Sequence, residues 1–337
     1  MKKEETKVII DSDCNLVYAS FYIQGLYQLF GKRNVSFGRL EGKPAQLGDL
    51  CFVVRHGDGK ERKYSLMLTD SYKVIETLYD WCDVYGSVNA NFAKTPQKFH
   101  DKLVSLCPSF GVRIWSLPRA FSFALIDQAG IKVPVKKRMG KARRMTHRLP
   151  YSAYVPSPSS DHDVFFLSTL WYNDEWNKND EGVNARRATF IRVCRELEGV
   201  DFEGGLVSMG KERSSEGLFA DCLCSGIPMS EWMEKTKRSA LAFNTPAFWD
   251  CHGWKLGEYL ALGKCIVSTA LSNDLPAPLE HGKNIHFIEN SPEAMREAVK
   301  YIIGHPDYKV MLEKGARDYW EKYGTQQASL KLLGIEK

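Results

Sequence analysis

Apolar and polar positions along this chain follow two periods in turn, which predicts an alternation of buried strands and amphipathic helices. KVIID (7–11) is a short β-branched run, typical of a buried strand. The stretch 16–30 then carries apolar residues at helical spacing, and Gly31 follows it where a glycine commonly ends a helix. Because the alternation continues through the chain, the pattern favours parallel βαβ units.

The remaining elements are expected from the same pattern. Strands are expected at 34–37, 51–55, 64–69, 83–88, 112–116, 164–168, 205–208, 240–244, 265–269 and 284–288. Helices are expected at 72–81, 118–129, 184–197, 231–238, 252–262, 292–303 and 307–323. Two of the helices have a visible start. Ser230 is the expected N-cap of the fourth, and Ser291, Pro292 and Glu293 suit the N-cap, N1 and first turn of the sixth.

A change of character between 133 and 163 predicts a linker between two domains. A basic run is followed there by a stretch rich in proline and serine. Two domains also suit the length, because a single core stops growing at about 250–300 residues. We expect an α/β fold of two doubly wound, Rossmann-like domains facing across a cleft. Their bounds are 1–150 on the acceptor side and 163–323 for the nucleotide, joined by 151–162, with 324–337 as a tail packing back on the first domain.

Composition narrows the class of protein. With 44% hydrophobic and 26% charged residues, the chain is neither disordered nor collagen-like. No stretch approaches the roughly 18 consecutive apolar residues of a membrane span. No secretory signal is expected at the N-terminus, and the nine scattered cysteines suit reduced thiols in the cytoplasm. The net charge of +5 is compatible with an anionic ligand, a membrane surface or nucleic acid.

The positive charge concentrates between Lys132 and Arg148. Seven further basic residues lie between them without any acid: Lys136, Lys137, Arg138, Lys141, Arg143, Arg144 and His147. The run has two main interpretations, a solvated linker or a peripheral contact with anionic lipid headgroups at the inner membrane face. Nucleic acid is the weakest alternative, because no recognition motif accompanies the charge and aromatic residues are not interleaved with it.

The stretch 240–289 carries the candidate chemistry. A strand, the polar loop TPAFWDCHG, a short helix and a second strand follow each other, so the helix begins on the ligand-binding side of the sheet. A helix N-terminus suits a phosphate, and Lys255 in its first turn adds a mobile charge. Glu258, one turn on, shares a face with Lys255 and is suited to accept from two vicinal hydroxyls, as on a ribose. Asp250 in the loop could accept from hydroxyls of a sugar.

KLGEYLALGKCIVST (255–269) resembles the C-terminal domain of GT-B-fold glycosyltransferases, in which K-x-x-E-Y-x-A-x-G-K-x-V-x-x-T is common. The retaining group 1 branch carries two acids as Glu-x7-Glu, and here Asp250 and Glu258 keep that spacing with a shorter first acid. The resemblance implies that Glu258 binds the ribose of a nucleotide sugar and that Asp250 faces the donor sugar. It covers roughly 239–323, where a glycine-bearing loop, a strand and a helix also match the family's usual ending.

Two departures from the family stand in the sequence. The glycine-rich loop after the first strand is replaced by DSDCN (11–15), and the Gly-Arg…Lys pattern after strand 164–168 is absent. The diphosphate contact therefore has several candidates: Arg186, Arg187, Arg192, Lys211 and Arg213. A retaining transfer needs no separate general base, whereas an inverting one would take it from the first domain, with Asp13 and His56 as candidates.

The expected site follows from these observations. Catalytic roles are assigned to Asp250 and Lys255, and nucleotide-sugar binding to Glu258, His252, Gly253, Trp254, Lys211 and Arg213. Each has a structural alternative: a solvated helix residue for Glu258, a surface lysine for Lys255, a helix-stabilising acid for Asp250, and packing for the tryptophans. No metal or other cofactor is expected, since Asp11-x-Asp13 is a weak match and Cys222-x-Cys224 lacks a second pair.

The expected function is a hexosyltransferase-type enzyme of polysaccharide biosynthesis. Its partners would be a nucleotide-sugar donor and a glycan or lipid-linked acceptor, and no nucleic acid. The alternative is a degenerate nucleotide-sugar-binding partner protein without turnover, which the missing glycine-rich loop favours. A Rossmann oxidoreductase is disfavoured, because no G-x-G-x-x-G follows a strand.

Overall fold

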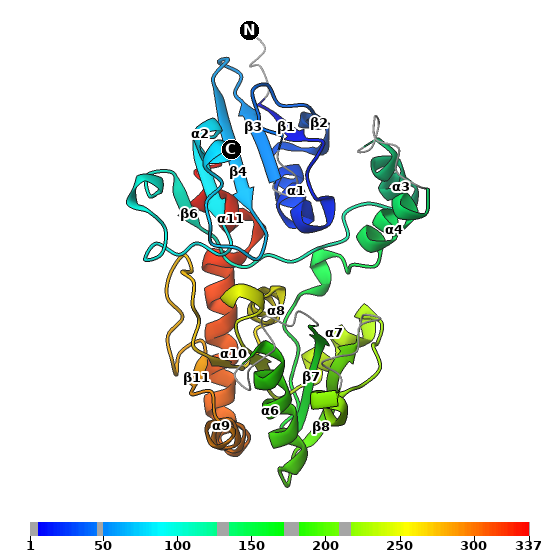
Figure 1. Cartoon of the computed structure of the whole chain (residues 1–337), viewed down its shortest axis with the longest axis vertical. Helices are drawn as coiled ribbons and strands as arrows, with labels where there is room; N and C mark the ends of the chain where they lie inside the picture. The colour runs from blue at the N-terminus through cyan, green and yellow to red at the C-terminus, as the bar shows by residue number, and fades with distance from the viewer. Residues whose placement is uncertain (1–5, 46–49, 127–134, 172–181, 209–216, 337) are drawn as a thin grey trace. The chain divides into compact units, whose positions relative to one another are not determined.

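The chain folds into two compact α/β units, shown by a computed structural model that describes residues 6–45, 50–126, 135–171, 182–208 and 217–336 (Figure 1). Unit 1 comprises Met1–Tyr154, Asn273–Ala277 and Lys322–Lys337, and unit 2 comprises Val155–Ser272 and Pro278–Glu321. The chain therefore returns to unit 1 twice, once through a short loop and once through its last residues.

Unit 1 is built on a six-stranded sheet in the order β2-β1-β3-β4-β5-β6. The strands are β1 (Lys7–Asp11), β2 (Val35–Gly38), β3 (Leu50–Arg55), β4 (Glu61–Met67), β5 (Val84–Ser87) and β6 (Leu103–Ser105). The expectation of wholly parallel pairing is wrong for β3, which runs antiparallel to both β1 and β4. The turn HGDGK (56–60) makes β3 and β4 a hairpin, with Gly59 at φ 84°.

The helices of unit 1 are α1 (Leu16–Phe30), α2 (Glu76–Trp81), α3 (Leu117–Ile126), α4 (Val135–Thr146) and α11 (Gln326–Leu332). α1 has the predicted bounds, with Asn15 capping its start and Gly31 at φ 81° after its end. α11, from the end of the chain, packs on α1 (Figure 1). Gly25 makes this contact possible, because a Cβ there would lie 3.1 Å from the side chain of Gln326.

Three expectations for this half are corrected. The segment 112–116 is irregular and not a strand, because its N–H groups bond outside any sheet: Val112 donates to Ser20 Oγ at 2.9 Å and Arg113 to the carbonyl of Leu149 at 2.9 Å. The short strand β6 was not expected. The basic run is not an irregular linker, since 135–146 form helix α4, whose Ala142 and Met145 are buried. Residues 127–134 lie outside the described part.

The described residues of unit 2 form five strands, all paired in parallel: β7 (Asp163–Leu170) with β8 (Asp201–Ser208), and β10 (Ile266–Thr269) with both β9 (Ala242–Asn244) and β11 (His286–Ile288). Just ahead of β9, Ala240 N–H donates to the carbonyl of Asp163 at 2.7 Å, which places β7 beside β9. The resulting order β8-β7-β9-β10-β11 is that of a doubly wound sheet.

The helices of unit 2 are α6 (Val183–Glu196), α7 (Met229–Arg238), α8 (Trp254–Ala261), α9 (Pro292–Gly304) and α10 (Pro306–Tyr319). α9 begins as predicted, since Ser291 Oγ accepts from Ala294 N–H at 3.1 Å. α7 begins after Pro228, so Ser230 is not its cap. The core joins sheet and helices through Phe190 and Phe243, whose rings stack at 4.1 Å. The α/β fold class predicted from the sequence is confirmed.

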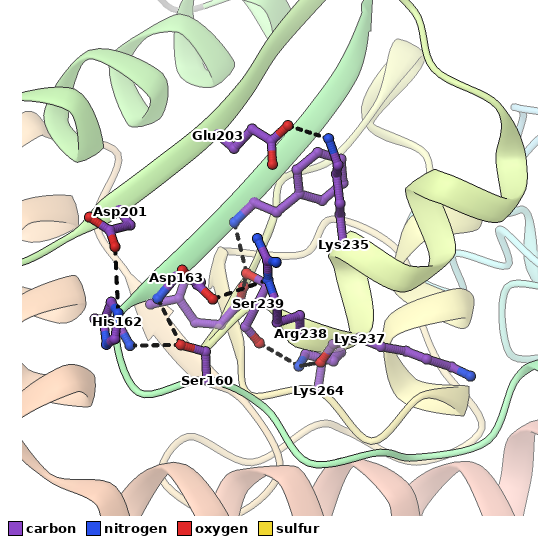
Figure 2. A network of polar contacts seen from close by, with 12 residues as sticks. Ser160, His162, Asp163, Asp201, Glu203, Lys235, Lys237, Arg238, Ser239 and Lys264 are labelled. Carbon is purple, nitrogen blue, oxygen red and sulfur yellow. Dashed lines mark hydrogen bonds and ion pairs between the residues drawn. The ribbon is translucent and has the colours of Figure 1, made fainter.

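The second half of the motif 255–269 has a structural role. Gly263, at φ 59°, lets α8 end against α10, where a Cβ would lie 3.2 Å from the carbonyl of Glu313. Lys264 is 2% exposed and donates to the carbonyls of Lys237 and Ser239, at 2.9 and 2.5 Å (Figure 2). It therefore satisfies carbonyls at the C-terminal end of α7 and its exit, where a cation is favourable.

A polar network surrounds that point, at the amino end of β7 (Figure 2). Asp163 pairs with Arg238 at 3.1 Å, and Lys235 pairs with Glu203. His162, Asp163 and Asp201 lie close enough for their ligand atoms to fall within 4.8 Å of one another. Nε2 of His162 lies 3.5 Å from a carboxylate oxygen of Asp201. These three residues are at the amino end of β7, opposite the carboxyl end where the candidate site lies.

Among the described residues, no helix combines the length and the apolar character that crossing a bilayer requires.

Gly315 in α10 tests the packing of unit 2. A Cβ there would lie 1.9 Å from the carbonyl oxygen of Lys283, so Gly315→Ala should lower the free energy of unfolding by about 3 kcal/mol or more despite alanine's better helix propensity. Gly304→Ala is the control, because nothing lies within 4 Å of its Cβ. Urea unfolding of the two variants measures the difference, and equal stability would contradict the described contact.

Candidate functional site

The carboxyl ends of β7 and β9 mark the place in unit 2 where a ligand is expected. β7 and β9 belong to two hydrogen-bonded ladders, β7-β8 and β11-β10-β9, that lie side by side through the bond from Ala240 to Asp163. The chain continues from β7 outward to β8 and from β9 outward to β10. Such a reversal opens a crevice outside the carboxyl ends of the two strands, and open α/β sheets bind their ligands there. The loop 245–253 and the start of α8 follow β9 at this edge.

The N-terminus of α8 suits an anion. Its N-cap is Gly253, at φ −74°, and no side chain caps the helix. The first N–H groups of a helix have no partner within it and carry the positive end of the helix dipole. The backbone here therefore provides donors for a phosphate without the obstruction of a capping side chain.

Glu258 is buried in the second turn of α8, with 5% of its surface exposed. The alternative of a solvated helix residue is therefore wrong. A buried carboxylate needs cations or donors around it, and the charge of Glu258 acts on Lys255, one turn earlier, and on the hydroxyl of Tyr259. Burial and the charge of Glu258 raise the pKa of Tyr259 above its ordinary range, so it stays a neutral phenol.

Lys255 is a half-buried lysine whose ammonium is withdrawn from water. It donates to the carbonyl of Leu167 in β7 and lies 5.1 Å from the ring centroid of Phe166. Burial, together with repulsion by Arg187, lowers the pKa of Lys255 to about 7, and Glu258 partly opposes this shift. A lysine with such a pKa is partly a neutral amine at pH 7, and a nearby anion favours its protonation to the ammonium form.

Arg187 of α6 brings a second buried cation to the same place. It is 7% exposed, and its Nη1 donates to the carbonyl of Thr169 near the end of β7 at 2.9 Å. Burial lowers its pKa to about 10. Arg192, another candidate for the diphosphate contact, is instead exposed and bound by both oxygens of Asp221, at 2.6 and 2.8 Å. Arg187 is therefore the one of these two that lies beside Lys255.

An aromatic rim borders the site and was not expected from the sequence. The buried Asn184 accepts from the N–H of Trp171 at 3.1 Å and donates to its carbonyl at 2.7 Å, which fixes the backbone just after β7. The ring of Trp171 lies 6.0 Å from Phe248, and Phe248 lies 4.5 Å from Trp249. A buried amide such as that of Asn184 usually holds a backbone segment, but its burial is not readable from the sequence, so no local pattern predicts this rim.

Asp250 is exposed and lies in an unusual backbone conformation. Trp249 and Asp250 both have positive φ, 52° and 58°, in the short helical turn Phe248–Asp250. The left-handed region is unfavourable for a bulky residue such as tryptophan, so the loop stores strain directly before α8. Asp250 precedes Glu258 on the chain but does not share its burial.

The other expected binding residues divide into three groups. His252 is buried, with 4% exposed, directly before the α8 N-cap. Gly253 is the N-cap itself and Trp254 the first residue of the helix, both half-buried. Lys211 and Arg213 lie outside the described residues.

The candidates for a general base in unit 1 do not lie together. Asp13 follows β1 at the carboxyl end of that strand and is exposed. His56 follows Arg55, which pairs with Lys7 at the start of β1, so it lies at the opposite end. A further acid of this region, Asp11 at the end of β1, is buried and forms an ion pair with the side chain of Lys43 at 2.7 Å.

Comparison with known proteins gives similarities in structure only. No protein-family model matches the chain. No curated protein matches it. Among solved structures, the C-terminal domain of the glycosyl transferase group 1 family protein LpcC from Francisella tularensis is similar over 52% of this chain and 97% of its own, at 8% identity and a TM-score of 0.37.

Two other solved structures are similar over more of the chain. WaaG, a glycosyltransferase involved in lipopolysaccharide biosynthesis, is covered over 74% of its length and this chain over 75%, with 14% identity and a TM-score of 0.39. Sucrose-phosphate synthase from Thermosynechococcus elongatus is covered over 87%, and this chain over 89%, with 12% identity and a TM-score of 0.40. The chemistry assigned to this site therefore comes from its own residues.

The pKa of Lys255 predicts how pH controls binding of a nucleoside diphosphate. The ligand's charge favours the ammonium, so affinity is full below pH 7, where Lys255 is already protonated, and falls as pH rises above 7. Between pH 6 and pH 8 the dissociation constant should rise about tenfold. Calorimetric titration of wild type and Lys255→Arg measures this, since arginine keeps its charge and the ligand's own titration is common to both. The same pH dependence in both proteins would contradict the role of Lys255.

Proposed function

We propose that the chain is a glycosyltransferase that moves a sugar from a nucleotide-sugar donor to a glycan or lipid-linked acceptor. The observation that supports this most is the buried Glu258 one turn from Lys255, with Arg187 acting on the same lysine, at the switch point of a doubly wound sheet. A carboxylate placed there accepts from the two hydroxyls of a ribose. The cations and the N-terminus of α8 favour the diphosphate that follows it.

In the proposed reaction, the bond between the anomeric carbon and the diphosphate oxygen breaks, and the acceptor hydroxyl forms the new bond to that carbon. Negative charge develops on the leaving phosphate while the anomeric carbon becomes cationic. Lys255, Arg187 and the α8 dipole stabilise the leaving group without a metal ion. On a retaining, front-face route the acceptor proton passes to the leaving phosphate oxygen, and Asp250 orients the donor sugar.

A second candidate is a nucleotide-sugar-binding partner protein without turnover. The observation that favours it lies in unit 1. At the carboxyl end of β1, where the resembled family has a glycine-rich loop, Asp11 and Lys43 form a buried ion pair. Buried pairs are costly to separate, so this edge is less open to a ligand than a glycine loop would be.

Glu258→Gln tests the nucleotide site. The amide keeps the shape and removes the charge, so binding of nucleoside diphosphates should weaken at least tenfold, the effect of losing about 1.4 kcal/mol of charge-assisted hydrogen bonding. Glu297→Gln on the exposed face of α9 is the matched control and should bind as wild type. Calorimetric titration with a panel of nucleoside diphosphates measures both. Unchanged binding in Glu258→Gln, or no binding by wild type, would refute the proposal.

Turnover then separates the two candidates. An enzyme should hydrolyse or transfer at least one nucleotide sugar in a panel of donors and acceptors, and Asp250→Asn should reduce the rate while diphosphate binding stays intact. Tight binding by wild type without hydrolysis or transfer across the panel would favour the partner protein.

We also propose that α4 contacts an anionic membrane face. Arg143 and Arg144 are exposed on this helix, and Met139 on α4 and Leu117 at the start of α3 are 57% and 60% exposed. Exposed apolar side chains beside basic ones suit a membrane interface. Lys132 and the side chains of 136–138 and 141 lie outside the described residues.

Arg143→Gln/Arg144→Gln tests this contact. Each basic residue near an anionic surface contributes about 1 kcal/mol, so partitioning onto phosphatidylglycerol vesicles should fall about thirtyfold at low salt. Lys300→Gln/Lys331→Gln removes the same charge from exposed positions elsewhere and is the control. Equal partitioning of the two double variants in vesicle sedimentation would argue against α4 as the contact.

A further inference from the structure

Unit 1 contains an aromatic cavity that the proposed donor site does not use. Its volume is about 540 Å³, and it lies between the end of α1, β2 and the start of α3. The walls hold four aromatic side chains: Tyr27, Phe37, Trp115 and Phe123. Phe123 packs against both Phe37 and Trp115, with ring centroids 4.9 and 4.7 Å apart, so the wall is a fixed cluster of rings.

The irregular segment 112–116 makes this cavity possible. As a strand it would have continued a sheet, but its backbone turns into α3 and places Trp115 against the rings from β2 and α3. Ile114, Trp115 and Ser116 also line a second hollow of about 390 Å³, which continues to Arg113 and to Thr146 of α4. The two hollows share this wall, and together they are termed the groove.

The charges around the groove all have one sign. Lys32, Arg119 and Arg113 line it, and none of its lining residues is acidic. Arg119 lies over the ring of Phe123, 4.8 Å from its centroid. Within the part of the chain that the structure describes, neither Lys32 nor Arg119 forms an ion pair with an acid. These cations are therefore available to an anion.

The backbone adds a second attraction for an anion. Ser116 lines both hollows and lies directly before α3, where its carbonyl accepts the N–H of Ala120 at 2.8 Å. The positive end of the α3 dipole therefore faces the groove. Ser36 and Ser116 contribute hydroxyls, which suit a ligand that carries hydroxyls of its own.

We infer that this groove binds an anionic sugar, with the C–H face of its ring on the half-buried Tyr27 and Phe37, which Trp115 and Phe123 back from behind, and its phosphate or carboxylate between Lys32 and Arg119. Aromatic faces accept the C–H side of a pyranose, the cations and the α3 dipole require a negative charge, and the volume suits one or two sugar rings. The same chemistry occurs in a free sugar phosphate and in the headgroup of a phosphoinositide or glycolipid. Under the proposed function this groove is the acceptor site.

The test uses glucose 1-phosphate as the soluble probe and glucose as its neutral match. Wild type should bind glucose 1-phosphate at least tenfold more tightly than glucose. Lys32→Gln and Arg119→Gln should each weaken that binding five- to tenfold, while Arg33→Gln, an exposed neighbour outside the groove, should stay within twofold. Because both substituted residues are exposed, the variants should fold, which circular dichroism checks.

Vesicles distinguish the two sources of the sugar. If the natural ligand is a headgroup, Lys32→Gln/Arg119→Gln should reduce binding to vesicles containing phosphatidylinositol more than binding to vesicles containing phosphatidylglycerol, which carry the same charge without a ring. Equal loss on both vesicles together with loss of glucose 1-phosphate binding assigns the groove to a free anionic sugar.

Several results would overturn the inference. The first is equal affinity of wild type for glucose and glucose 1-phosphate. The second is unchanged binding of glucose 1-phosphate in both groove variants. The third is loss of that binding in Glu258→Gln but not in the groove variants, which would place the ligand in unit 2. Nucleoside diphosphate binding by the same proteins keeps this test separate from the proposed function. The groove variants should retain it, and either site can fail while the other stands.

Discussion

The charge balance at the carboxyl edge of the unit 2 sheet is the constraint on which the site depends. One buried carboxylate, Glu258, lies one turn from Lys255, and the buried Arg187 from another helix acts on the same lysine. Burial and repulsion by Arg187 both disfavour the charged form of Lys255, and Glu258 partly compensates for them. The surplus of positive charge suits a ligand that brings its own negative charge, which under the proposed function is the diphosphate of the donor.

The motif 255–269 combines two different functions within one stretch. Its first half supplies Lys255 and Glu258 to the site. Its second half holds the fold together, because Gly263 lets α8 end against α10 and Lys264 satisfies carbonyls at the end of α7. The resemblance of this stretch to a family is therefore partly a resemblance in packing. A similar sequence here is weaker evidence for chemistry than the burial of Glu258 itself.

Local patterns predicted much of the fold. The bounds of α1 and the cap of α9 follow from Asn15, Gly31 and Ser291, whose effects act within a turn of the chain. Long-range contacts were not readable: 112–116 looks like a strand, but its N–H groups bond to Ser20 and Leu149. For the site, Lys255 and Glu258 were proposed from the expected start of a helix and from the resemblance of 255–269, and their roles stay predictions. The choice of Arg187 and the rim at Trp171 depend on which helix meets which strand, and no local pattern specifies that.

The return of the last residues to unit 1 affects how this protein is made. α1 buries one face against α11, with Gln326 Nε2 donating to the carbonyl of Phe21 at 2.9 Å. During synthesis the first 154 residues emerge long before α11, so that face of α1 stays uncovered until residues 326–332 have been made. A fragment ending at Tyr154 would expose the same surface permanently. Unit 1 is thus completed last, although its sequence comes first.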